Sequence, residues 1–136
     1  MTCGPQGLFV TMSLSAGGLG GVTLDLSYPP PLDIPGNGFE TDDSGFTDLT
    51  GRGGTYVLND RDTGADGVDD SVRIVYALVG QQGIGPGAVF RERLDCPNGS
   101  EVSPDALGCA VVAASDTSGN TVGGVTCALS AAGTQP

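Results

Sequence analysis

Glycine and proline occur so often in this chain that long helices are excluded. Twenty-four glycines and nine prolines are spread over 136 residues, and no long segment shows the periodicity of an amphipathic helix. Both residue types destabilise a helix interior, and both are common in the turns that join strands. The sequence therefore predicts an all-β fold of short strands and many turns.

Apolar residues alternate with polar ones over several segments, as they do in strands with one buried face. The clearest segment, 22–28, places Val22, Leu24, Leu26 and Tyr28 on one face and ends at three consecutive prolines. Glu92 falls on the inner face of another segment, which predicts an edge strand or a bulge there. Short strands at these intervals predict a two-layer antiparallel sandwich. Besides 22–28, strands are expected at 8–14, 55–58, 72–79, 88–96, 109–114 and 122–129, with at most a short strand or turn at 46–49.

Length and charge limit both the organisation and the partners. A chain of 136 residues with 38% hydrophobic content fits one domain, residues 1–136, with a single core. Five arginines, no lysine and sixteen acidic residues give a net charge of −11, which repels nucleic acid and anionic lipid surfaces. No apolar run approaches the length of about 20 residues that a membrane-spanning helix needs.

The four cysteines are predicted to form two disulfides. There is no Cys-x-x-Cys pair and no histidine to complete a zinc site, so an oxidising compartment, extracellular or at the cell surface, is expected. Three pairings are open. Cys96 and Cys109 bracket a polar loop, which makes Cys96–Cys109 with Cys3–Cys127 the preferred one. Asn98 begins an Asn-Gly-Ser glycosylation sequon in an expected loop.

An acidic loop with interspersed glycines precedes the expected strand 72–79. Calcium prefers six to eight oxygen ligands from carboxylates, carbonyls and water, and such a loop can supply them. The pattern is similar to the calcium loops of thrombospondin type 3 repeats. The alternative is a solvated turn whose aspartates bond to their own backbone. The predicted ligands, with calcium as the cofactor, are Asp60, Asp62, Asp66, Asp70 and, pointing outward or replacing one of these, Asp69.

The same loop contains Asp62-Thr63-Gly64, which resembles the active-site run of retroviral-type aspartic proteases. That chemistry needs two aspartates, one from each subunit, held in apolar packing so that they share a proton. Here the charged Asp60 and Arg61 precede the motif, in place of the apolar packing that this chemistry needs. Other enzyme classes lack their groups, because without histidine the usual triads do not form and without lysine no Schiff base does. We therefore predict a non-enzymatic protein, with the protease as the alternative.

Four segments follow one another in an order of strands and glycine-rich turns: Ser13–Val22, Leu24–Pro30, Ile84–Phe90 and Ala113–Asn120. This order resembles a bacterial, secreted, non-cellulosomal cohesin-like domain. The resemblance implies a jelly-roll sandwich that binds protein partners and frequently calcium. Family members usually carry a strand before the equivalent of Gly4-Pro5, so either this chain is trimmed or its sandwich lacks a first strand. A neighbouring copy could fill such a gap by strand addition, which gives extracellular adhesive filaments.

Overall fold

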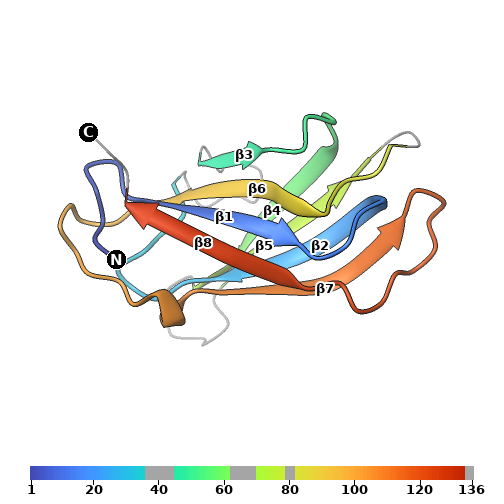
Figure 1. Ribbon diagram of the computed structural model, residues 1–136. Helices are drawn as coiled ribbons and strands as arrows, with labels where there is room; N and C mark the ends of the chain where they lie inside the picture. The colour runs from blue at the N-terminus through green and yellow to red at the C-terminus, as the bar shows by residue number, and fades with distance from the viewer. Residues whose placement is uncertain (36–44, 62–69, 79–81, 134–136) are drawn as a thin grey trace.

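The computed structural model describes residues 1–35, 45–61, 70–78 and 82–133, and it confirms the all-β prediction (Figure 1). The described residues contain strands and one short 3-10 turn, Pro104–Ala106, but no α-helix. The strands are β1 (Leu8–Leu14), β2 (Leu19–Ser27), β3 (Phe46–Asp48), β4 (Thr55–Arg61), β5 (Ser71–Ala77), β6 (Gly87–Leu94), β7 (Gly108–Asp116) and β8 (Cys127–Gly133).

The strands form two antiparallel four-stranded sheets that pack face to face. One sheet has the order β3-β6-β1-β8 and the other has the order β4-β5-β2-β7. β1 is paired along its whole length on both sides, with β6 and with β8. The four outer strands are therefore β3 and β8 in one sheet and β4 and β7 in the other, and these strands carry the sheet edges.

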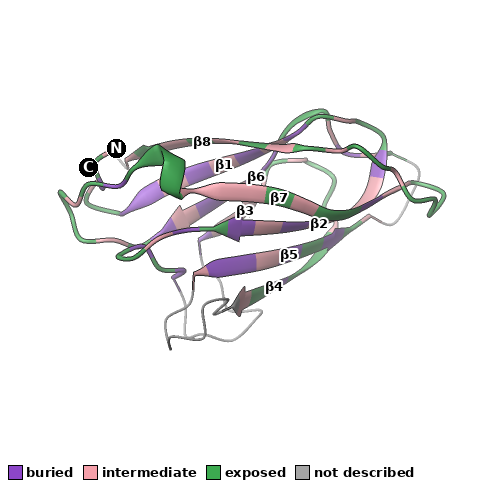
Figure 2. Cartoon of the chain, turned by 90° about the horizontal axis from the view of Figure 1, so that it is seen from below, coloured by how far each residue is buried: buried purple, intermediate pink, exposed green. Residues whose placement is uncertain are grey.

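The core lies between the two sheets, where the alternating residues of the central strands meet (Figure 2). β1 alternates strictly between buried and half-buried residues, as a strand with one face on the core should. The predicted inner face of segment 22–28 is confirmed, since all four of its residues are buried. Several strand boundaries differ from the predicted ranges, most of all the start of β2 and the start of β8.

β2 begins at Leu19, before the predicted start at Val22. Gly20 packs so closely against β7 that an added Cβ would lie 2.7 Å from the Asp116 carbonyl oxygen. Glycine is thus required by close backbone approach rather than by a turn. At the other end of the chain, β8 begins at Cys127 and not at Val122, because Gly124 has a φ of +75° and interrupts the extended chain.

β6 carries a bulge, as one of the two alternatives predicted, but the bulge lies three residues before Glu92 and leaves Glu92 on the inner face. β6 lies between β3 and β1, so the prediction of an edge strand is wrong, but the pairing of β6 with β1 shifts register between Met12 and Ser13. Val89 is the extra residue at this shift. Glu92 itself is fully buried, opposite Val10 of β1 and Phe46 of β3.

All four cysteines form disulfides, as predicted, but the preferred pairing is wrong. The bonds join Cys3 to Cys96 and Cys109 to Cys127. The N-terminal segment is tied to the turn after β6, because the Cys3 amide donates to the Ser100 carbonyl at 2.8 Å. This places Cys3 beside Cys96. Cys109 on β7 and Cys127 on β8 lie on the two edge strands of one side of the sandwich, so they face each other across the sheets.

Candidate functional site

The acidic loop connects β4 to β5. Two of the predicted calcium ligands, Asp60 and Asp70, are half-buried at its two ends, where Arg61 is paired with Ser71. The Asp70 carbonyl accepts a hydrogen bond from the Tyr28 amide at 2.9 Å, which fixes that end of the loop. The other predicted ligands, and the aspartate of the protease motif, lie outside the described residues: Asp62, Asp66 and Asp69. Within the described ranges no group of three metal-ligating side chains comes together.

Asn98 lies in an exposed turn after β6, as the glycosylation prediction requires. The turn is closed by Ser100, whose amide and hydroxyl both donate to the Pro97 carbonyl, at 3.0 and 2.6 Å. The Gly99 amide donates to the Cys3 carbonyl at 2.9 Å. The sequon is therefore accessible and is held next to the Cys3–Cys96 disulfide.

A polar network closes the side of the sandwich at β3 and β4. The buried Tyr76 hydroxyl of β5 donates to Asp48 Oδ2 at 2.9 Å and accepts from the Gly54 amide at 3.0 Å. Thr50 donates to Asp48 Oδ1 through both its amide, at 2.8 Å, and its hydroxyl, at 2.6 Å. Burial raises the pKa of Tyr76, which is consistent with a structural hydroxyl that stays protonated.

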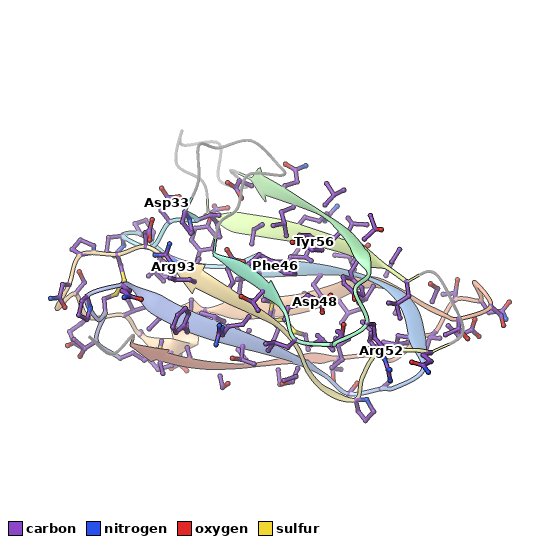
Figure 3. The ribbon with its side chains drawn as sticks, turned by 90° about the horizontal axis from the view of Figure 1, so that it is seen from above. Asp33, Phe46, Asp48, Arg52, Tyr56 and Arg93 are labelled. Atoms are coloured by element: carbon purple, nitrogen blue, oxygen red, sulfur yellow. A yellow bond between two sulfur atoms is a disulfide. The ribbon has the colours of Figure 1, made fainter. Side chains whose placement is uncertain are left out.

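Aromatic rings reinforce this closed side. Phe46 of β3 lies 4.6 Å from Tyr56 of β4 and 5.4 Å from Phe90, measured between ring centroids. Phe90 in turn lies 5.1 Å from Tyr76. Figure 3 shows Phe46 and Asp48 on β3, with Tyr56 on β4 of the other sheet. The rings and the hydrogen bonds together join the two sheets on this side.

A polar cleft of about 360 Å³ lies at one end of the sandwich, near Arg93 and Asp33 (Figure 3). Arg93 is paired with Asp95 at 2.6 Å and donates to the Gln6 carbonyl at 3.2 Å. Asp33 accepts from the Ile34 amide at 2.9 Å. These contacts are made among residues that line or adjoin the cleft, so its charged groups have a structural role.

The outer face of the β4-β5-β2-β7 sheet carries a row of small side chains. Val57, Val75, Thr23 and Ala113 are direct cross-strand neighbours, and the two valines are 41% and 44% exposed. Beside this row Arg73 makes two bonds of 2.8 Å to Asp25, and these bonds raise the pKa of Arg73. Because these two charges are paired, the face beside the row is locally neutral.

The opposite side of the sandwich, at β7 and β8, has no comparable polar network or ring cluster among the described residues. We call the two strands together the β7/β8 edge, residues 108–116 and 127–133. No residue of β8 is fully buried, and β7 buries only Ala114. The Cys109–Cys127 disulfide is the covalent link between the two strands. The inner side chains of this edge, including Val111 and Leu129, remain half-exposed at the margin of the core.

The β7/β8 edge is also almost free of charge. Asp116 is the only charged residue after Asp105, although the chain contains 21 charged residues in all. Charged side chains and prolines are the usual protection of an edge strand against pairing with another chain. The scarcity of charged residues is visible in the sequence, but it identifies a sheet edge only once the strand order is known.

The structure thus offers one unprotected edge and one outer face with a row of mostly exposed, uncharged side chains, while the acidic loop is described only at its ends. No helix in the described part of the chain is long and apolar enough to cross a membrane. No family model, no curated protein and no solved structure matches this chain.

Proposed function

We propose that this chain is a secreted, non-enzymatic module that assembles with protein partners, foremost further copies of itself, by adding a strand at the β7/β8 edge. Two disulfides in a small domain fit an oxidising environment outside the cell. The similarity to cohesin-like domains supports protein binding as the activity. The localisation, the partner and the mode of assembly are all parts of the proposal.

The observation that carries the proposal is the unprotected state of β8. The other three edge strands each have a form of protection. β3 has three residues and ends at Asp48, β4 carries Asp60 near its end, and the outer side of β7 is partly covered where Val122 donates to the Ala114 carbonyl at 2.9 Å. β8 has seven residues, with no charge and no proline. A strand of this kind accepts an added strand through its free backbone groups.

Whether the proposed assembly forms filaments depends on which surfaces of the copies meet. If each copy adds a strand to the next in head-to-tail fashion, the contact does not close and a filament grows. If two copies use the same surface, the contact closes as a pair and a second surface is needed for growth. The exposed row that includes Val57 and Val75 supplies such a second surface.

The acidic loop is proposed to hold a structural calcium ion. Asp60 and Asp70 stand at the two ends of the loop, so an ion bound between them and the loop would stiffen the connection of β4 with β5. This role is separate from assembly, because the loop belongs to the side of the sandwich that the Tyr76 network closes. The edge that we assign to assembly lies on the other side.

Sedimentation velocity of the native, oxidised protein over a wide concentration range tests the assembly function. We expect the weight-average sedimentation coefficient to rise with concentration as copies associate. A single monomeric species whose coefficient does not depend on concentration would overturn self-assembly, and with it the proposed function.

A further inference from the structure

We infer that two copies of this chain join by pairing their β8 strands antiparallel across a twofold axis, with Ser130 opposite Ser130 of the second copy. The inference rests on the assembly function proposed above and specifies the contact through which two copies assemble. The partner is a second copy, and the reasons are the incomplete burial of β8, the distribution of charge and the fit of β8 to itself.

The first reason is that β8 is only half built into the core. On one side it pairs with β1 over all seven residues, from Leu8 opposite Gly133 to Leu14 opposite Cys127. On its other side, no strand of the described ranges pairs with it. Leu129 stands opposite Met12, which is fully buried, yet Leu129 itself stays half-exposed. An added strand would cover the inner side chains of β8 and complete the core at this margin.

The second reason is electrostatic. Each copy has a net charge of −11, so two copies repel each other over most of their surfaces. β8 has no charged residue, and along β7 beside it the single charge is Asp116 at the strand's end. Contact through β3 or β4 would instead bring Asp48 or Asp60 of the two copies together. The β8 edge is therefore where two such acidic molecules meet with the least repulsion.

The third reason is that β8 is complementary to itself. An antiparallel pairing about Ser130 is the one register that matches all seven residues of both strands. It sets Leu129 opposite Ala131 on the inner face, so that a large side chain meets a small one in both halves of the contact. On the outer face it sets Ala128 opposite Ala132. No two large or like-charged groups oppose each other.

The resulting junction joins two four-stranded sheets into one continuous sheet. Its order would be β3-β6-β1-β8 followed by the same strands of the second copy in reverse. Both copies use the same surface, so the contact is isologous and closes as a dimer. A filament would then require a further contact elsewhere on the module.

Opposite charges at Ser130 test both the contact and its register. Ser130 is exposed on the outer face, so each isolated copy can accommodate Ser130→Lys or Ser130→Glu. In the dimer either variant places two like charges directly opposite each other, and we expect a rise in the dissociation constant of at least about tenfold. An equimolar mixture of the two variants should restore the dimer, because the introduced lysine of one copy then faces the introduced glutamate of the other. Thr55→Lys, exposed at the start of edge strand β4 and outside the row that includes Val57, is the matched control and should dimerise as the wild type does.

Sedimentation velocity of the oxidised proteins separates the outcomes, with thermal unfolding to confirm that each variant is folded. A wild-type dimer that both single variants lose and the mixture regains supports the inference. If the wild-type protein associates but the variants associate equally well, or their mixture regains nothing, the β8 contact or its register is wrong while the assembly function stands. A wild type that is monomeric at every concentration overturns both.

Discussion

Replacing Tyr76 with phenylalanine should destabilise the protein strongly, because one hydroxyl group organises the closed side of the sandwich. The change leaves the ring and its contact with Phe90 in place but removes the acceptor of the Gly54 amide and a donor to Asp48. A hydrogen bond between neutral groups contributes about 1 kcal/mol and one to a charged group about 2 kcal/mol. The free energy of unfolding should therefore fall by about 3 kcal/mol, which lowers Tm by roughly 10 °C in a domain of this size.

Tyr56→Phe is the matched control. Tyr56 is directly opposite Tyr76 in the β4–β5 pairing, also contacts an aromatic ring, and is 43% exposed. Its hydroxyl makes no hydrogen bond within the described residues, so its loss should change stability by less than about 0.5 kcal/mol. Chemical denaturation with linear extrapolation measures both variants. Equal stabilities for the two variants would refute the role assigned to the network.

The raised pKa of Tyr76 adds a pH dependence to the same prediction. The stabilisation is fully present below the pKa of an unfolded tyrosine, about 10, and is lost as the pH rises through the higher pKa of the folded protein. Tyr76→Phe should consequently lose less further stability above about pH 10 than the wild type does. An identical alkaline loss in both proteins would assign the pH dependence to other groups.

Three further predictions concern the disulfides, the β7–β8 connection and the acidic loop. Replacing Cys3 and Cys96, which are 93 residues apart, should lower the free energy of unfolding by about 4.6 kcal/mol on the loop-entropy model. Replacing Cys109 and Cys127, which are 18 residues apart, should lower it by about 3.2 kcal/mol. Chemical denaturation that shows the reverse order would contradict the pairing. Hydrogen bonds from the Asn120 and Ser118 amides lower the pKa of Asp116, so stability is lost as the pH falls through that pKa, and Asp116→Ala should lose less between about pH 5 and about pH 2. An acid titration that is the same for both proteins would exclude this. A chelator should lower Tm and added calcium restore it, whereas an unchanged midpoint removes the metal from the acidic loop.

The strands were predictable where the sequence pattern is local. Segment 22–28 alternates regularly and stops at consecutive prolines, and the structure keeps its inner face. The glutamate on an apolar face of β6 predicted an edge strand or a bulge; a bulge is present at Val89, but it does not turn Glu92 away from the core. Alternation reports which side chains share a face, but it carries no information on which strands are neighbours. The position of β6 between two strands was missed for that reason.

The disulfide pairing was not predictable because it depends on topology. Cys96 and Cys109 are close in sequence, but Cys96 follows β6, an inner strand, whereas Cys109 lies on β7, an edge strand that faces edge strand β8 of the other sheet. Cys3 reaches Cys96 through backbone hydrogen bonds between segments almost a hundred residues apart. The candidate site also depends on topology. The sequence shows that Asp116 is the only charged residue after Asp105, but the exposed edge of β8 follows from the order of the strands.

Hydrogen–deuterium exchange of the β8 amides at low and high protein concentration shows whether the edge of this strand is the assembly surface. Exchange within Cys127–Gly133 should slow as concentration rises, while the amides of edge strand β4, Thr55–Arg61, should exchange at an unchanged rate. Exchange in β8 that does not depend on concentration, or new protection confined to β4, would contradict this assignment of the assembly surface.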